Sequence, residues 1–516
     1  MKHARPPTSR LFTNLSTALK PLLMLALLSL VSSPVRANVD GDTESAAAGR
    51  WLTLEQVDAD IALAREAYER IHPGYTRYAT ATELDAAWND IRDRAEATGG
   101  MSVGDFYLEV ERALTTIRCD HTKAELPNTL REARKGQPFY LPFRWTLVEG
   151  RGFVTEPAEG SDLAIGDELL SIDGESLAAR VEAVAPYIPV DGFTDWARQG
   201  QISESLEFMG GAMDHFGGLL WDIGPTVELR VRDRAGDERT VTADRIDFAA
   251  WTALGQRTGR ARNFKDAVTF ERLGERGGYL RVDTFVNYRQ PVDPDTLYGP
   301  IFEAMATEGR DRLILDLRRN GGGSTDAMQR LVAHLITEPL PLALDMRVAT
   351  LDHDGLVEHL QTWDERALNP DPAGFRANDD GTWSLQPFVS DELQPVQPAP
   401  NAFDGELILL TSGSNGSGST NLIAILDGVG RATLVGEKTG GTAEGTTAGV
   451  LFTLTLPESG VRARLPFFRY RNNVPSFEPG LGVSPDISAP MTAEAFLAGE
   501  DPAYLAALEL LESSGR

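Results

Sequence analysis

The sequence predicts a multidomain α/β protein, and the pattern of apolar residues along the chain leads to that prediction. In the first part, apolar residues return every three or four positions, as in amphipathic helices, and strand-like segments follow. From Gly278 onward, short apolar strands alternate with helices, which is typical of parallel βαβ units buried on both faces. The chain has 516 residues, of which 42% are hydrophobic and 24% charged. That length is enough for several domains with substantial cores.

The first 37 residues are expected to be a signal peptide. Basic residues without any acidic one precede a continuous apolar or small run at 21–33, and Val35 and Ala37 offer small residues at the cleavage-site positions. The run is shorter than the roughly 20 residues that span a bilayer, so we expect no stable membrane span after signal cleavage. These features predict a periplasmic or secreted bacterial protein.

Charge and cysteine content exclude several classes of function. The formal net charge is −27, so the chain will not bind nucleic acid through its overall charge. The one cysteine, Cys119, excludes an internal disulfide framework and every Cys-rich metal site. The sequence has no HExxH motif and no Walker A run. We therefore expect no metal and no organic cofactor, and the sequence leaves the oligomeric state open.

The pattern changes divide the rest of the chain into regions. The expected regions are a helical N-terminal domain (50–135), a β-rich domain (138–247) with a helical insertion (178–222), an α/β core (265–490) and a C-terminal helix (491–516). The helical domain ends at the segment RCDHTK. The β-rich domain begins where the apolar periodicity shortens to that of strands.

Two strand–turn–helix segments of the core carry candidate chemistry. In LILDLRRNGGGSTDAM, the glycines after Asn320 let the backbone turn tightly and expose its N–H groups. In LILLTSGSNGSGSTNLIAIL, a serine hydroxyl at the helix start can lie beside a backbone N–H that receives an oxyanion. Residue types alone do not rank Ser412, Ser414, Ser417 and Ser419. Each of them also suits a turn or a helix N-cap.

Taken together, these segments resemble the core of the C-terminal processing, tail-specific and tricorn-like serine peptidases. The resemblance extends to SNGSGSTNLIAILDGVGRATLVGEKTGG and to FEPGLGVSPDI at 477–487. IGDELLSIDGESL at 165–177, with TVELRVRD, resembles the PDZ domain of that family. The resemblance implies a ClpP/crotonase-like α/β core, a PDZ-like domain, a helical N-terminal domain, and a peptide or protein substrate.

The resemblance also implies which residues act. Counting back from GRATLVGE places the nucleophile on Ser417 and one oxyanion donor on the N–H of Gly418. The second oxyanion donor falls on Gly321 or Gly322. The C-terminal processing branch carries a basic lysine about 25 residues after its serine, but here that position is Thr442.

The base is therefore expected to be the histidine of the tricorn-like branch, which falls on His121 in CDHTK. A lysine base would need its pKa lowered from about 10.4 to about 7, whereas histidine titrates near 6.5 without that cost. A histidine base also needs an acceptor that holds its tautomer. Glu478 is the first candidate for that acceptor, and Asp120 is the second.

The function implied is that of an exported serine endopeptidase that forms an acyl-enzyme and acts on the C-terminal regions of proteins or peptides. PDZ domains hold a terminal carboxylate and extend their sheet with a peptide strand, although the insertion at 178–222 can block that groove. The missing lysine leaves one alternative open. In that alternative, the chain is a non-catalytic ligand-binding protein on the same scaffold. A further possibility is another hydrolase, such as an esterase.

Overall fold

The structure is a computed structural model that describes residues 49–205, 207–255 and 261–513. The expected signal peptide lies outside the described residues. Within those ranges, no helix is both long enough and apolar enough to cross a bilayer.

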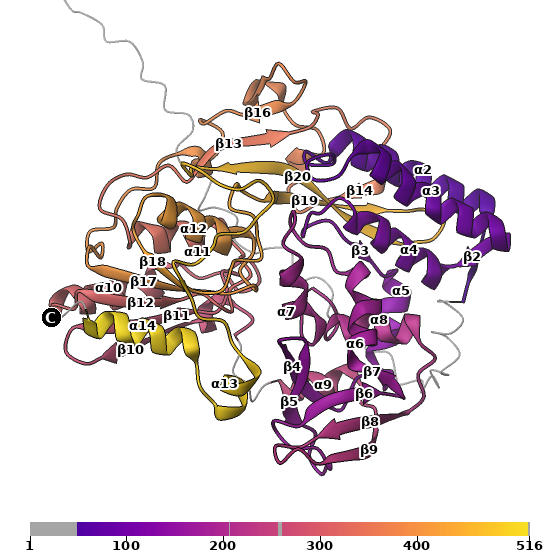
Figure 1. The fold of residues 1–516 in the computed structure, drawn as a ribbon. Coiled ribbons are helices and arrows are strands. Elements are labelled where there is room, and N and C mark those ends of the chain that lie inside the picture. The colour runs from indigo at the N-terminus through magenta and orange to yellow at the C-terminus, as the bar shows by residue number, and fades with distance from the viewer. Residues whose placement is uncertain (1–48, 206, 256–260, 514–516) are drawn as a thin grey trace, which may run out of the picture. The chain divides into compact units, whose positions relative to one another are not determined.

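The N-terminal part of the described chain is helical (Figure 1). Its elements are β1 (Trp51–Thr53), α2 (Leu54–Ile71), α3 (Ala81–Thr98), β2 (Gly100–Ser102), α4 (Val103–Thr115), β3 (Ala124–Glu125) and α5 (Asn128–Lys135). Thr53 and Thr80 begin α2 and α3 with capping boxes, in which a side chain satisfies the free N–H groups of the first turn. After α4 the chain turns through Arg118, whose φ is 58°, toward His121.

The PDZ-like region is an antiparallel sheet with helices inserted between two of its strands. In spatial order its strands are β4 (Phe143–Val148), β5 (Arg151–Pro157), β6 (Glu168–Ile172), β8 (Thr226–Arg232) and β9 (Glu238–Asp244), with β7 (Glu175–Ser176) on β6. Between β7 and β8 lie α6 (Leu177–Val184), η1 (Ala185–Tyr187), η2 (Asp195–Arg198), α7 (Gln199–Ile202) and α8 (Ala212–Leu220), and α9 (Phe248–Leu254) follows the sheet.

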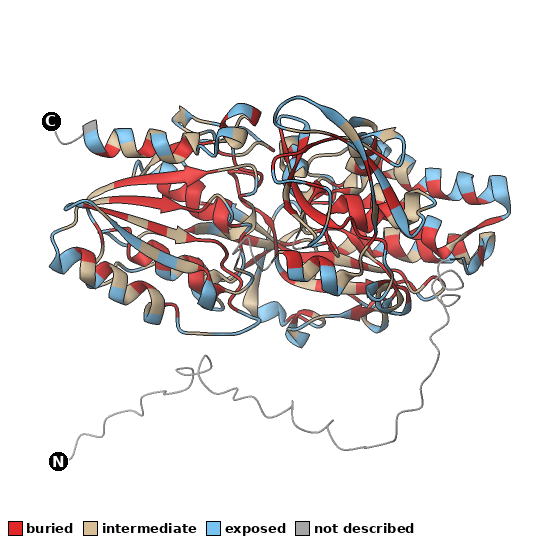
Figure 2. Ribbon diagram, turned by 90° about the horizontal axis from the view of Figure 1, so that it is seen from below, coloured by how far each residue is buried: buried red, intermediate tan, exposed pale blue. Residues whose placement is uncertain are grey.

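The core contains a mostly parallel sheet with helices on both faces, which confirms the predicted fold class. In spatial order its strands are β10 (Val268–Leu273), β11 (Gly277–Val282), β12 (Arg312–Asp316), β17 (Glu406–Thr411), β18 (Thr433–Gly436) and β21 (Ile487–Ser488). All but the outer strand β10 run parallel. The central strands β12 and β17 are buried along nearly their whole length (Figure 2).

Helices cover the two faces of this sheet unequally. One apolar cluster joins the sheet to α10 (Asp295–Thr307), α11 (Thr325–Ala333) and α12 (Ser417–Gly428). A second cluster joins the other face to α14 (Pro502–Ser513). Because β12 and β17 are parallel neighbours, the loops that follow their carboxyl ends meet at one edge of the sheet. Those loops are the Gly-rich and Ser-rich turns singled out in the sequence.

A second sheet brings the N-terminal region to the same part of the molecule. In spatial order its strands are β14 (Leu360–Gln361), β19 (Thr447–Thr455), β20 (Arg462–Asn472), β13 (Ala343–Val348), β16 (Trp383–Leu385) and β15 (Phe375–Ala377). The strand β3, which follows the turn with His121, pairs with β20. The remaining short elements are η3 (Phe264–Asp266), η4 (Val357–His359), η5 (Glu365–Ala367), η6 (Pro372–Gly374), η7 (Asp391–Leu393) and α13 (Ala493–Ala498).

Candidate active site

Ser417 is the first residue of α12 and has an unusual backbone conformation. Its φ is 46°, in the left-handed region that non-glycine residues seldom occupy. Such a conformation costs on the order of 1–3 kcal/mol and persists only where the surrounding structure enforces it. Here Gly322 packs against the serine, since a Cβ on Gly322 would lie 2.7 Å from Ser417 Cβ. The strained turn therefore fixes the direction of the Ser417 side chain.

The structure separates the four serines that the sequence could not rank. The Ser412 hydroxyl donates to the carbonyl of Arg318 at 2.6 Å. Ser419 is fully buried, and its hydroxyl oxygen accepts from Nδ2 of Asn415 at 3.1 Å. These two hydroxyls hold the turn together. Ser414 lies exposed on the turn, whereas Ser417 is half-buried beside the glycine loop.

Asn415 connects the serine turn to its neighbours. Its Nδ2 donates to the carbonyl of Leu317 at 2.6 Å and to that of Asn320 at 3.2 Å. Its backbone carbonyl accepts the N–H groups of Gly440 and Gly441, each at 2.8 Å. Through its side chain and its backbone carbonyl, this buried asparagine ties together the loops after β12, β17 and β18.

The glycine loop offers main-chain donors beside Ser417. The Gly322 N–H already donates to Oδ1 of Asn320 at 2.9 Å. Within the described residues, neither the Gly321 N–H nor the Gly418 N–H donates to a protein acceptor. Gly323, with φ at 140°, lies so close to Phe285 that a Cβ would be 2.3 Å from its carbonyl carbon. The N–H groups of Gly321 and Gly418 are therefore free to donate hydrogen bonds to an oxyanion.

The turn with His121 packs against the turn with Ser417. A Cβ on Gly416, the residue before Ser417, would lie 3.9 Å from Oδ2 of Asp120. The imidazole of His121 is half-buried, and its Nδ1 lies 3.4 Å from the hydroxyl of Thr446. Two segments nearly 300 residues apart in sequence are therefore in contact here.

His72 makes a hydrogen bond to the turn with His121. Its Nδ1 accepts the N–H of Gly74 at 3.1 Å, so its Nε2 carries the proton and donates to the Thr122 hydroxyl at 2.9 Å. Burial lowers the pKa of His72 to about 3, so the ring is neutral at ordinary pH. This neutral imidazole, hydrogen-bonded at both ring nitrogens, holds Thr122 in place directly after His121.

The acceptor candidates named from the sequence lie in different places. Glu478 is exposed, and in its only hydrogen bond among the described residues its backbone carbonyl accepts the N–H of Leu481. Its role as acceptor stays a prediction. Asp120 is half-buried, and its Oδ1 lies 3.8 Å from Nζ of Lys123.

Asp191 is a further buried carboxylate, from the insertion, that lies beside His121. No motif surrounds Asp191, so no sequence signal pointed to it.

Lys438 and Thr442 lie at or near the sequence position of a lysine base. Lys438 is exposed, and its Nζ lies over the ring of Trp196 at 5.6 Å. Thr442, at the lysine position of the C-terminal processing branch, is buried and its hydroxyl faces the carbonyl of Gly445 at 3.4 Å. Neither of these contacts involves Ser417.

Cys119, His121 and Asp191 bring donor atoms within 4.8 Å of one another, close enough to raise the question of a metal. The Cys119 thiol donates to the carbonyl of Thr447 at 3.5 Å, and burial raises its pKa to about 12. Cysteine binds metal ions as a thiolate, and the Cys119 thiol is hard to deprotonate. This donor set therefore fits metal binding poorly.

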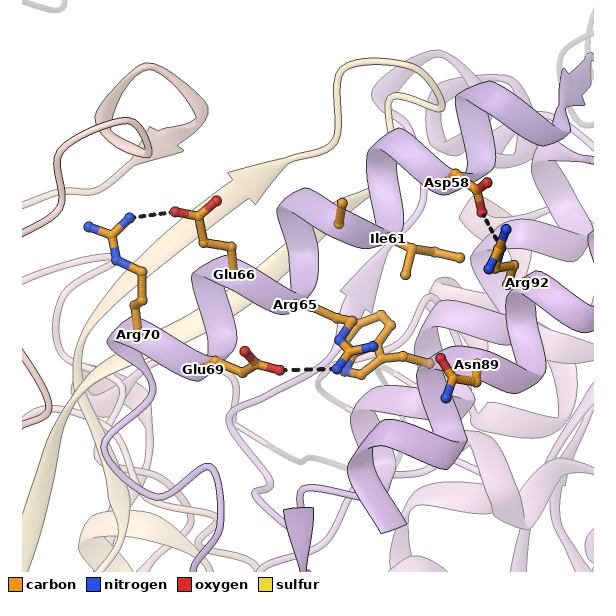
Figure 3. Close-up of a pocket in the computed structure, with 10 residues that line it drawn as sticks. Asp58, Ile61, Arg65, Glu66, Glu69, Arg70, Asn89 and Arg92 are labelled. Carbon is orange, nitrogen blue, oxygen red and sulfur yellow. Dashed lines mark hydrogen bonds and ion pairs between the residues drawn. The ribbon is translucent and has the colours of Figure 1, made fainter. Parts of the chain in front are cut away.

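A surface hollow of about 570 Å³ lies between α2 and α3, away from these loops. Figure 3 shows that its charged side chains pair with one another. The pairs are Arg65–Glu69 at 3.5 Å, Arg70–Glu66 at 2.6 Å and Arg92–Asp58 at 3.1 Å. We assign no ligand to this hollow.

Comparison with known proteins identifies the core. Residues 276–489 match the model of peptidase family S41, and residues 137–251 match that of a PDZ domain. Residues 276–489 form a peptidase family S41 domain. The resemblance stated from the sequence is thereby confirmed. Membership of this domain in the S41 family indicates a serine peptidase with peptide or protein substrates.

Solved structures show the same fold over most of this chain. Mature CPAF is 17% identical, with a TM-score of 0.58, over 86% of this chain and 94% of that chain. Mature CPAF complexed with lactacystin is 16% identical, with a TM-score of 0.60, over 89% of this chain and 97% of that chain. A comparison with curated protein sequences gave no significant match.

Proposed function

We propose that this protein is an exported serine endopeptidase that hydrolyses peptide bonds through an acyl-enzyme, with Ser417 as nucleophile and His121 as general base. The observation that carries the proposal is the contact between two turns. The strained Ser417 begins α12 beside the glycine loop, and the turn with His121 packs against the preceding Gly416. This arrangement supports a Ser–His mechanism rather than a Ser–Lys one.

The proposed reaction has two halves. His121 accepts the hydroxyl proton of Ser417 while the serine oxygen attacks the substrate carbonyl carbon, and His121 then gives that proton to the leaving amine. In the second half, His121 takes a proton from water, whose oxygen attacks the acyl-enzyme. The ester bond breaks, and the proton returns to Ser417. The protein ends unchanged, and the substrate has gained one water.

The tetrahedral intermediates carry a negative oxygen that needs hydrogen-bond donors. The Gly418 N–H at the start of α12 is one donor, helped by the partial positive charge of the helix N-terminus. Gly321 is the better second donor, because the Gly322 N–H is already taken by Asn320. Each such donor contributes roughly a hundredfold or more to the rate.

A fluorophosphonate probe, which forms a covalent bond with activated serines, tests the nucleophile and the base. We expect the wild-type protein to be labelled, with labelling abolished in Ser417→Ala and reduced by at least about a hundredfold in His121→Ala. Ser414→Ala is the matched control and should be labelled like the wild type. Undiminished labelling of Ser417→Ala, or no labelling and no peptide cleavage by the wild type, would overturn the proposal.

The preferred substrates are proteins or peptides cleaved near a free C-terminus. A PDZ-like domain supports this proposal, because such domains bind a terminal carboxylate and extend their sheet by a peptide strand. The outer strand β9 carries mostly exposed residues. At the other end of the sheet, the Leu147 carbonyl of β4 accepts Nε2 of Gln199 at 3.0 Å, so that strand is partly covered by the insertion.

The test of this preference is a pair of peptides that differ only in a free or an amidated C-terminus. We expect a higher kcat/KM for the free acid, and tighter binding of that peptide to Ser417→Ala in fluorescence anisotropy. Equal turnover and equal binding of the two peptides would remove the C-terminal preference and leave the peptidase mechanism standing.

Export is supported by the basic and apolar pattern of residues 1–37 and by the single cysteine. Expression of the full chain in a Gram-negative host, followed by fractionation and N-terminal sequencing, tests it. We expect a periplasmic or secreted product that begins near Asn38. A cytoplasmic product that retains Met1 would contradict export.

A further inference from the structure

Residues 191–196, here called the insertion strap, run from the PDZ-like region to the loops around the candidate active site. The strap belongs to the stretch between η1 and α7 and ends in η2. Its hydrogen bonds to those loops are Gly192 N–H to Arg118 O (2.9 Å), Phe193 N–H to Gly480 O (2.7 Å) and Thr194 Oγ1 to Gly440 O (2.7 Å). The strap is therefore attached both to the turn with His121 and to the loop after β18.

Asp191 is the first residue of the strap and is almost fully buried, with 4% of its surface exposed. Its Oδ1 accepts the backbone N–H of Asp120 at 2.9 Å. Its Oδ2 is buried and has no hydrogen-bond partner among the described residues. A carboxylate oxygen of Asp191 and a ring nitrogen of His121 lie within 4.8 Å of each other.

The surroundings of Asp191 leave its charge poorly compensated. Burial raises the pKa of Asp191, and the neighbouring carboxylate of Asp120 raises it further, whereas His121 acts in the opposite direction. The charged and titratable groups around this pair are Cys119, Asp120, Lys123, His72, Arg77 and Glu207. The nearby cations have partners of their own, because Arg77 pairs with Glu444 at 3.1 Å and Lys123 with Glu207 at 3.5 Å.

An imidazolium on His121 would supply the compensating charge that Asp191 lacks. Such a cation forms when His121 takes the proton of Ser417, so the carboxylate favours the state in which the serine is activated. We propose that Asp191 is the positioning residue that holds the imidazole of His121 for proton transfer to and from Ser417. Asp191 keeps its negative charge throughout and takes no proton. This inference rests on the proposed Ser417–His121 mechanism.

The role assigned to Asp191 differs from the one predicted for Glu478. The Glu478 carboxylate is exposed to water, where a charge interacts weakly with its neighbours. Asp120 is held toward Lys123 and Gly416 instead. Asp191 combines burial, an unused oxygen and proximity to the ring. With Asp191 in this role, the PDZ-like region contributes a side chain to the peptidase site.

The test compares Asp191→Asn, Asp191→Glu and Glu478→Gln by peptide kcat and KM, and by the fluorophosphonate labelling rate across pH. We expect Asp191→Asn to lower kcat by about a hundredfold or more with little change in KM, because only the activated state is affected. The acid limb of its labelling profile should move to lower pH, since the imidazolium has lost its partner. Asp191→Glu should recover part of the rate, and Glu478→Gln should lower kcat less than Asp191→Asn does.

Several outcomes would overturn the inference. One is an Asp191→Asn variant with wild-type kcat, and another is a loss of rate with no movement of the acid limb, which indicates only a structural role. A large loss in Glu478→Gln with none in Asp191→Asn would return the acceptor role to Glu478. If Asp191→Asn does not fold, as judged by circular dichroism, Asp191→Glu carries the test. In that variant, a lowered kcat with an unmoved acid limb at unchanged KM would contradict the proposal, because the loss would then be only structural.

Failure of this inference can be told apart from failure of the proposed function. If Ser417→Ala or His121→Ala retains full labelling, the mechanism itself is wrong, whatever Asp191 does. If both lose labelling while the Asp191 variants behave as wild type, the Ser–His mechanism stands and only the positioning role falls.

Discussion

Asn320 accepts the N–H of Gly322 on its side-chain Oδ1 at 2.9 Å, and this bond distinguishes two glycines that the sequence left equivalent. Asn320 is itself fully buried, and its Nδ2 donates to the carbonyl of Val282 at 3.1 Å. The amide is thus fixed at both ends. Gly322 serves the packing around Ser417, and Gly321 keeps the N–H that can meet an oxyanion.

Alanine at these two glycines should have very different effects. Gly322 has φ at 104°, and a Cβ there would lie 2.7 Å from Ser417 Cβ, so Gly322→Ala must displace the serine. We expect kcat/KM to fall about a hundredfold or more, because small misplacements of reacting groups are costly. Gly321→Ala keeps its N–H, and its Cβ would meet only the Ser414 carbonyl at 3.8 Å, so activity should stay within about threefold. Equal losses in the two variants would contradict this distinction.

Asn415→Asp should uncouple the loops of the site with little change in side-chain size. The new carboxylate oxygen would face the carbonyls of Leu317 and Asn320, which now accept from Nδ2. We expect a loss of about 1–3 kcal/mol in the free energy of unfolding, together with a clear fall in kcat. Both are measurable by urea unfolding and peptide hydrolysis.

Asn473→Asp is the matched control for Asn415→Asp, because Nδ2 of Asn473 donates to the Pro341 carbonyl at 2.9 Å away from the serine turn. It should lose some stability and keep its kcat. A wild-type kcat in Asn415→Asp would show that this amide does not hold the site together.

Replacement of the two possible bases should give opposite results. Lys438 is exposed over Trp196, so Lys438→Ala should keep peptide hydrolysis within about twofold of wild type. His121→Ala should reduce it by at least about a hundredfold. The measurement is kcat/KM on one peptide at pH 7.5. If Lys438→Ala is the inactive variant, the Ser–Lys mechanism is correct.

Glu111 should make stability depend on pH. It is fully buried under the start of β3, and its Oε2 accepts the N–H of Ala124. Burial raises its pKa from 4.5 to about 8. The folded chain therefore binds the Glu111 proton more tightly than the unfolded chain does. The stability that this provides is fully present below about pH 4.5 and is lost as the pH rises through about 8.

Glu111→Gln cannot ionise and should lack this loss. We expect the free energy of unfolding of the parent, minus that of Glu111→Gln, to fall between pH 5 and pH 8 by at most about 1.4 kcal/mol per pH unit. Urea unfolding of both chains in the Ser417→Ala background measures it without self-cleavage. A constant difference over this range would show that Glu111 is ionised in the folded state.

Much of the core was predictable from the sequence because its signals are local. Apolar strands such as LILDL and LILLT predict buried parallel strands, and the glycines and serines after them predict turns at one edge of a sheet. The helix with Ser417 begins at that serine. Periodicity could not choose among the four serines of this turn, and the choice of Ser417 came from the family motif.

The buried carboxylate beside His121 was not predictable, because burial of a carboxylate depends on packing between distant segments. Asp191 lies 70 residues after His121, in an insertion without a motif, and only tertiary contacts bury it beside the ring. Glu478 was chosen from its position in a motif; it is exposed in the structure, and its role as acceptor stays a prediction.

By itself, the amino-acid sequence determined the α/β class, the serine-rich and glycine-rich turns and the resemblance to a peptidase family, since each of these is written in neighbouring residues. Tertiary structure decided which serine is strained, which glycine N–H stays uncommitted, and which carboxylate is buried next to His121. These properties arise where loops from separate regions pack together. Desolvation, strain and hydrogen-bond competition exist only once those loops are in contact.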